Sequence, residues 1–380
     1  MNAFFRFLKP LTGLIIIIFM AWYFSDIFTF IIISAILSLI GRPLSSRLQR
    51  IRIKKFKVNA TFAAGITIFS MLLVTFLIIL FIVPLISRQA NIISNIDTEA
   101  VSAYFAEPFN AIYHFLVRYN VLQPNQSIGL FFEDQLNQLL SVAHFKNFFG
   151  HLLSATSMVF MGLFIVLFLT FFFLKDPNLL RSIIMSLTPE KYVKDIKVVM
   201  TDSRLLLTRY LLGIMLELTL MMTFITLGLT FFGIQNALII GFLGGLMNII
   251  PYLGPIIGAS IGILLGIISV LSSGDFDMVG ITTLFIAGTF IIANVVDNIL
   301  LQPLIYSKSV KAHPIEIFLI IIMAGKVGGI FGMVIAIPTY TVFRVVARQF
   351  LSQLKFIQAL TENMGVKHHF DDDTKKPDVS

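Results

Sequence analysis

The stretch Asn248-Ile249-Ile250-Pro251-Tyr252-Leu253-Gly254-Pro255 decides how the rest of this chain is interpreted. Apolar sequence flanks it on both sides, yet it contains two prolines, a glycine and an asparagine. In hydrocarbon a backbone must bond its own polar groups, so a helix that faces lipid avoids such a break. The break is tolerated where it is buried in protein or lines a wet cavity. A simple proline kink, which is common in membrane helices, explains the motif equally well.

Composition indicates an all-α integral membrane protein. Of the 380 residues, 57% are hydrophobic and 13% are charged, which excludes an ordinary soluble domain. The absence of cysteine excludes disulfides and thiolate metal sites. The net charge of +8 reports the orientation of loops in a membrane protein, and no nucleic-acid partner is expected. Arg6 and Lys9 precede an apolar run without a small-residue cleavage site, which predicts a retained membrane anchor.

The first half of the chain is expected to cross the membrane several times. Residues 11–40 are apolar but interrupted near the middle, which predicts two short crossings or a shallow hairpin. Residues 42–57 hold seven Lys or Arg and no acid, so this loop is placed in the cytoplasm. Residues 59–87 then lead outward and residues 152–174 return. The mixed segment 88–151 is expected outside, as amphipathic helices on lipid or neighbouring subunits, or as an ordinary packed helical loop.

An abrupt change in charge marks the predicted domain boundary. Residues 175–209 carry seven basic and four acidic side chains, whereas residues 210–307 contain no Lys or Arg at all. We therefore expect residues 1–209 to form a membrane scaffold that also carries the subunit contacts of a homo-oligomer. Residues 210–346 form the second domain, with the functional site.

The second domain is predicted to contain an inverted repeat. Residues 210–232 and 281–303 are long enough to span, and each precedes an interrupted segment, 237–271 or 315–346. Basic residues flank 315–346 on both sides, so this segment must enter and leave from the cytoplasm. For the same reason, residues 237–271 cannot be a single crossing. They form a hairpin from the outside or two full spans, and their short halves favour the hairpin. The predicted fold is a polytopic helical bundle with two re-entrant helical hairpins.

The tip of the second hairpin is expected at Gly325-Lys326-Val327-Gly328-Gly329. Two hairpins that meet tip to tip would place it near residues 251–255, and Pro338 is a further candidate hinge. Residues 347–380 are predicted to be a cytoplasmic tail, disordered from about residue 364. Both termini are therefore expected in the cytoplasm.

The candidate substrate or ion site consists of polar side chains that are expected to lie within the membrane. A carboxylate at the bilayer centre costs roughly 2.5–3.5 kcal/mol on insertion scales, so its presence suggests a function. Asn294, Asp297 and Asn298 lie at i, i+3 and i+4 and would share one helical face. Lys326 could pair with Asp297 or with Glu217. The substrate or ion site is predicted from Glu217, Asn248, Asn294, Asp297, Asn298, Gln302 and Lys326.

Other classes of function fit the residues less well. Glu316 is expected near the membrane interface, without a role of its own. A membrane enzyme would need a histidine-rich or nucleophilic constellation at one depth, and the sequence has none, nor a spacing that predicts a metal site or a cofactor. A scaffold without transport activity would leave Asp297 and the broken helices unexplained.

Three motifs resemble the autoinducer-2 exporter family. They are residues 251–259 (Pro-Tyr-Leu-Gly-Pro-Ile-Ile-Gly-Ala), residues 297–305 (Asp-Asn-Ile-Leu-Leu-Gln-Pro-Leu-Ile) and residues 328–333 (Gly-Gly-Ile-Phe-Gly-Met) followed by Ala-Ile-Pro at 336–338. Their order and spacing match the family, and the resemblance covers residues 5–355.

The resemblance implies a transporter of the inner or plasma membrane with seven to eight hydrophobic segments and no ATP-binding domain. Members of the family are linked to export of the quorum-sensing signal autoinducer-2 or to Na⁺(Li⁺)/H⁺ antiport. The expected partners are thus membrane lipid and a small-molecule or cation substrate.

Overall fold

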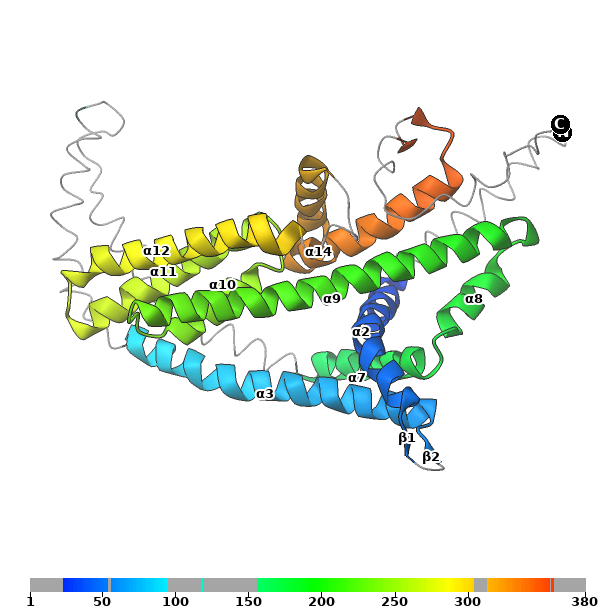
Figure 1. The fold of residues 1–380 in the computed structure, drawn as a ribbon, viewed down its shortest axis with the longest axis horizontal. Helices are drawn as coiled ribbons and strands as arrows, with labels where there is room; N and C mark the ends of the chain where they lie inside the picture. Colours follow the sequence, from blue (N-terminus) through cyan, green and yellow to red (C-terminus); the bar gives the residue numbers. More distant parts are fainter. Residues whose placement is uncertain are drawn as a thin grey trace, which may run out of the picture. The chain divides into compact units, whose positions relative to one another are not determined.

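A computed structural model describes residues 23–53, 56–94, 118, 156–303, 313–355 and 357–358. Predictions for the beginning of the chain, for most of the external segment and for the distal tail lie outside these residues. Figure 1 shows the described elements. In chain order they are α2 (Ser25–Arg50), β1 (Arg52–Ile53), β2 (Phe56–Lys57), α3 (Ala60–Ser94), α7 (Thr156–Lys175), α8 (Leu179–Leu187), the 3-10 turn η1 (Glu190–Tyr192), α9 (Val193–Phe231), α10 (Ala237–Met247), α11 (Leu253–Ser273), α12 (Met278–Val296), the π-helix η2 (Asp297–Leu301) and α14 (Pro314–Phe350).

The described part of the chain is helical apart from the two-residue strands β1 and β2. Six of its helices are long and apolar enough to cross a membrane, or up to seven if the bent pair α7–α8 is one span. The predicted all-α polytopic class is confirmed at this level. Chain contacts divide the protein into two compact units, Met1–Phe76 with Leu153–Arg204 and Leu77–Leu152 with Leu205–Ser380. The functional division into scaffold and second domain stays a prediction.

In the first unit, α2 packs against α7. The hydroxyl of Ser34 on α2 donates a hydrogen bond to the carbonyl oxygen of Val166 on α7 at 3.0 Å. The predicted loop from residue 42 is wrong as far as Arg50, because α2 continues through it. Arg47 and Arg50 lie in the last turn, where positive charge interacts favourably with the helix dipole. Beyond it, Arg52–Ile53 and Phe56–Lys57 form the antiparallel pair β1–β2, with Arg52 opposite Lys57.

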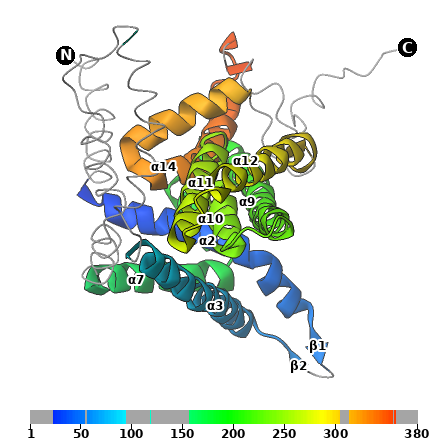
Figure 2. The ribbon, with the colours of Figure 1, turned by 90° about the vertical axis from the view of Figure 1, so that its left-hand side faces the viewer.

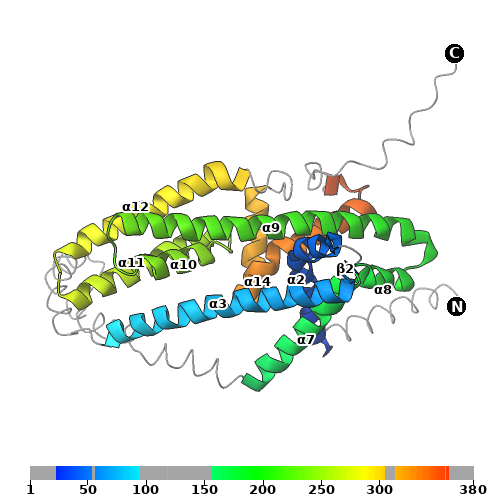
Figure 3. The same cartoon turned by 60° about the horizontal axis from the view of Figure 1, so that its bottom comes forward.

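In the second unit, the part of α9 from Leu205 onward forms one apolar core with α10, α11 and α12. Figure 3 shows these helices side by side. The buried core side chains come from all four helices: Met221, Ile225, Leu229, Ala237, Ile239, Ile240, Leu265, Ile286, Phe290 and Ala293. Glycines allow these helices to approach closely. A Cβ on Gly262 would lie 2.8 Å from the ring of Phe290 and 2.9 Å from Ile240.

Helices α10 and α11 fold back on each other, as predicted for 237–271. At the open end, the amide of Asn236 donates to the hydroxyl of Ser269 at 3.2 Å. Nearer the turn, a Cβ on Gly258 would lie 2.9 Å from the carbonyl oxygen of Gly244. Helix α10 has 11 residues, about 16 Å, which is too short for a full span and favours the hairpin over two spans. Its re-entrant placement in a membrane stays a prediction.

The motif Asn248–Pro255 contains the turn between α10 and α11. Tyr252 has φ 66° and ψ −45°, a conformation that is costly for an aromatic residue. The two residues that follow begin α11. A side chain on Gly254 would overlap the carbonyl group of Met247, so only glycine fits this turn.

Helix α14 also folds back, as predicted for 315–346 (Figure 2). Its helical geometry is broken at Gly328 (φ −126°, ψ 16°) and Gly329 (φ 57°, ψ −144°), within the predicted tip. The second of these conformations is accessible to glycine almost alone. The candidate hinge Pro338 lies inside the regular second arm and does not interrupt it. The inverted repeat of the two hairpins stays a prediction.

The turn of the first hairpin lies against the side of α14. Ile250 and Ile321 share a buried cluster with Ala336, and the ring centroids of Tyr252 and Phe318 are 6.4 Å apart. The tip itself, from residue 326 to 330, is exposed. The contact therefore involves both arms of α14, around Ile321 and Ala336, and leaves the tip exposed.

Candidate functional site

The first buried polar pair joins α9 to the end of α10. Glu217 is 4% exposed and Asn248 is 5% exposed. The amide nitrogen of Asn248 donates a hydrogen bond to Oε1 of Glu217 at 3.4 Å. Asn248 can reach the carboxylate because α10 ends at Met247, one residue before it. The interrupted helix thus brings a polar side chain to an acid inside an apolar bundle.

The second polar pair lies at the end of α12. Asp297 has no exposed surface, and its Oδ2 accepts a hydrogen bond from the amide of Gln302 at 2.9 Å. Its other oxygen, Oδ1, is buried and has no hydrogen-bond partner among the described residues. A half-satisfied buried carboxylate is costly, and it can be stabilised by a proton or a cation.

A π-helix holds Asp297 in this position. The five residues of η2 follow the regular α12, and their wider turn pairs residues i and i+5. The backbone N–H of Gln302 bonds to the carbonyl oxygen of Asp297, so the same two residues meet through backbone and side chain. Single π-turns occur often at functional sites.

The predicted face of three polar residues is divided between two sides of the chain. Asn298 is exposed, and its amide donates to the side chain and the carbonyl group of Asn294 at 2.9 Å. Asp297 is buried and bonds to Gln302 instead. Adjacent residues of a helix point about 100° apart, so Asp297 can face the core while Asn298 beside it faces outward. Asn294 and Asn298 keep the ordinary i, i+4 contact.

The predicted pairing of Lys326 with an acid is not found. Lys326 lies at the exposed tip of α14 and makes no ion pair within the described part of the chain. Of the predicted hinge positions, Pro251 and Pro255 lie at the turn before α11 and in its first turn, and Gly325 contacts Met333 on the second arm.

Sequence reasoning missed a polar cluster inside α14. The hydroxyl of Tyr340 donates a hydrogen bond to Oε2 of Glu316 at 2.7 Å, and the guanidinium of Arg344 lies 5.7 Å from the centre of the Tyr340 ring. Tyr340 is 9% exposed and Arg344 is 3% exposed. The chain reverses at residues 328–329, and Glu316 and Tyr340 lie equally far from Gly328 in the sequence. A hairpin at this position predicts that the two side chains meet.

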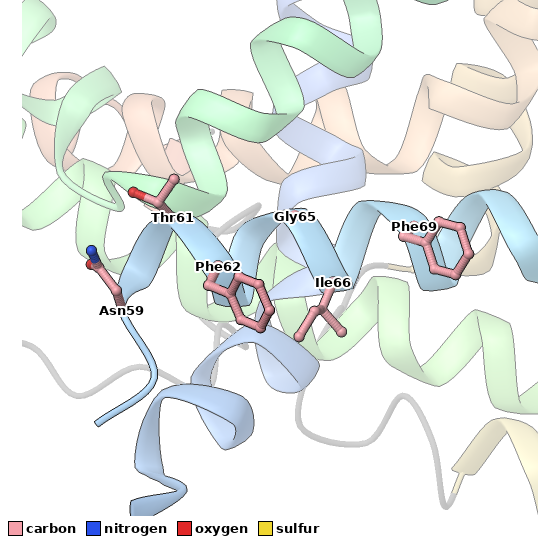
Figure 4. A pocket seen from close by; sticks show the side chains of 6 residues that line it. All are labelled: Asn59, Thr61, Phe62, Gly65, Ile66 and Phe69. Carbon is pink, nitrogen blue, oxygen red and sulfur yellow. The ribbon is translucent and has the colours of Figure 1, made fainter. Parts of the chain in front are cut away.

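An apolar groove of about 530 Å³ runs along the first turns of α3 (Figure 4). Phe62, Ile66 and Phe69 line it from one side of the helix, with Asn59 and Thr61 at one end. None of the predicted site residues contributes to this groove. The described residues also contain no group of three His, Asp or Glu side chains placed to hold a metal ion.

Comparison with known proteins gives the same class as the geometry. The sequence model of a family described as AI-2E family transporter matches residues 11–352. Two Bacillus subtilis proteins, YrrI and YueF, are 32% identical over 184 residues and 30% identical over 177 residues. These matches cover 48% and 47% of this chain and 50% and 46% of the relatives, so the chain spans about half the length of each. MJ1177 of Methanocaldococcus jannaschii is 22% identical over 85% of this chain and 89% of its own. Names of all three describe transport proteins and state no substrate. Since the family model covers nearly the whole sequence, this chain belongs to the AI-2E family of transporters.

Proposed function

We propose that this protein is a secondary transporter that exports a small polar molecule such as autoinducer-2 and couples the export to an ion gradient by alternating access. The observation that carries the ion coupling is the complete burial of Asp297, one of whose carboxylate oxygens has no hydrogen-bond partner among the described residues. A proton or a monovalent cation would occupy this position and offset the cost of the buried charge. The choice of autoinducer-2 rests on family membership alone.

The route of the substrate follows the broken helices. Asn248 and Glu217 form their pair where α10 ends, and unwound backbone at this turn offers carbonyl and amide groups to a polar ligand. The second hairpin supplies a similar break at Gly328–Gly329. Both breaks belong to the same compact unit as Asp297.

A Na⁺(Li⁺)/H⁺ antiporter is the second candidate. It is favoured by the presence of two buried carboxylates, Glu217 and Asp297, in a stretch without Lys or Arg between residues 210 and 307. Such an environment selects cations over anions and requires no organic substrate.

We also infer a cell-membrane location with both termini in the cytoplasm, and a homo-oligomer assembled through residues 1–209. The apolar surface of α3 supports contact with lipid or a neighbouring subunit, because Phe62 is 67% exposed and Phe69 is 66% exposed. Chemical cross-linking of the protein in native membranes tests the assembly.

Reconstituted vesicles separate the two candidates. The purified protein is placed in liposomes loaded with autoinducer-2, and efflux is measured under imposed H⁺ or Na⁺ gradients. Internal pH is followed in parallel with a dye after addition of Na⁺ or Li⁺ to empty vesicles. Gradient-driven efflux of autoinducer-2 supports the exporter, whereas cation-dependent proton release without any organic substrate supports the antiporter. Neither signal, with correctly inserted protein, would refute both.

A further inference from the structure

The two arms of α14 are joined by a polar contact across the hairpin. Glu316 and Tyr340 are 24 residues apart, about 36 Å along a straight helix, yet their side chains meet at 2.7 Å. The break at Gly328 and Gly329 makes this contact possible. Arg344, one turn beyond Tyr340, places its guanidinium over the same ring and lies on the same arm.

This contact is strong for its surroundings. A hydrogen bond from a hydroxyl to a carboxylate is charge-assisted, and a guanidinium over an aromatic face gains further attraction where water is excluded. Tyr340 and Arg344 are both buried, so water competes little with either interaction. We call Glu316, Tyr340 and Arg344 the α14 clamp: the Tyr340–Glu316 bond joins the two arms, and Arg344 packs on Tyr340 from the same arm.

The first arm of α14 supports the turn of the first hairpin. Ile321 has no exposed surface and shares its cluster with Ile250. The ring of Phe318 meets that of Tyr252 at an interplanar angle of 77°. Tyr252 keeps a backbone conformation that its surroundings must impose, and four residues earlier Asn248 reaches Glu217.

We propose that the α14 clamp is a set of positioning residues for the Glu217–Asn248 pair. By fixing the angle between the arms, the clamp holds Phe318 and Ile321 against the turn, and the turn holds Asn248 at the carboxylate. Helix α14 then moves as one body during transport, and the hinge lies outside it. The proposal rests on the proposed transport function for its link to ion binding.

A distance measurement tests the positioning without any substrate. The chain has no cysteine, so spin labels can be attached at Ile256→Cys on α11 and Val327→Cys at the tip of α14, which are 65% and 91% exposed. The full chain in liposomes is compared with the variants Tyr340→Phe and Glu316→Gln. Both variants should broaden the distribution of distances between the labels, with the larger effect in Tyr340→Phe, because glutamine still offers an acceptor to the hydroxyl.

Transport kinetics provide the second readout. A loss of positioning should raise the KM for the driving ion, Na⁺ or H⁺, by about tenfold in Tyr340→Phe, with the maximal rate per folded protein within about twofold. The control matched to Glu316→Gln is Glu190→Gln, which makes the same chemical change at an exposed acid in η1. If Tyr340→Phe is not recovered folded, Glu316→Gln carries the same comparison.

Two outcomes would overturn the proposal. The first is an unchanged distance distribution in both variants, and the second is a lower maximal rate with an unchanged KM, which would leave the clamp a feature of stability only. If the unmodified protein shows no gradient-driven transport, the proposed function fails, while the distance measurement still decides whether the clamp positions the turn.

Discussion

Replacing Asp297 by asparagine keeps the shape of the side chain and removes its carboxylate. Three energies decide whether the variant folds. Removing a carboxylate from membrane depth gains about 2.5–3.5 kcal/mol on insertion scales. The bond from Gln302, 2.9 Å long, becomes a neutral one and weakens by about 1 kcal/mol. The amide nitrogen at the position of the unpartnered Oδ1 costs about 1–3 kcal/mol as a buried donor without an acceptor.

These contributions offset each other to within about 2 kcal/mol, so Asp297→Asn should fold and insert normally. Ion-driven transport should nevertheless fall to the level of protein-free vesicles, because the amide can carry neither a proton nor a cation's counter-charge. The assay combines thermal unfolding in detergent with flux in reconstituted vesicles, and Asp275→Asn in the exposed turn before α12 is the control. Full gradient-driven flux by Asp297→Asn at normal expression would refute the reasoning and leave Glu217 as the candidate coupling group.

Three further predictions concern the first hairpin and the topology. Gly258→Ala should destabilise the protein by about 1–3 kcal/mol, because its Cβ would lie 2.9 Å from a carbonyl oxygen of α10; Gly280→Ala, which meets nothing within 4 Å, should be neutral or stabilising in the same thermal scan. Asn248→Ala should cost about 1–3 kcal/mol and slow transport in reconstituted vesicles, since a buried carboxylate loses a donor; unchanged stability and flux would contradict this. Cysteines at Ser273 and Leu354, both exposed, should react with a membrane-impermeant maleimide from opposite sides, the first from outside; labelling of both from one side would rule out the inverted repeat.

The two hairpins could be predicted because their signals are local. Prolines, a glycine and an asparagine within an apolar run mark the break at 248–255, and the glycines at 328–329 mark the second break. The positive-inside rule predicts that the basic residues on both sides of 315–346 lie on the same side of the membrane. This segment is therefore expected to enter and leave from that side. Each of these signals acts through backbone geometry or membrane electrostatics, which do not depend on how distant segments pack.

The boundaries and the tip contact depended on packing and were predicted less well. Helix α2 runs on to Arg50 because its arginines suit a helix end as well as they suit a loop. The turn of the first hairpin packs around Ile321 and Ala336 of α14, whereas the tip stays exposed although Val327 and Ile330 are apolar. Hydropathy predicts which segments lie in the membrane, but it does not predict which helix faces pack against each other.

The candidate site shows most clearly where pattern reasoning ends. The grouping of Asn294, Asp297 and Asn298 assumed one shared face, but Asp297 is buried and Asn298 beside it is exposed. The π-helix that begins at Asp297 changes the register only of the residues that follow it. Its effect is to bring Gln302 to the buried acid, whereas Asn294 and Asn298 keep their i, i+4 hydrogen bond. One carboxylate oxygen of Asp297 has no partner within the part of the chain that the structure describes, and a buried charge without a partner is energetically costly. This remaining oxygen is what an ion or a proton would stabilise.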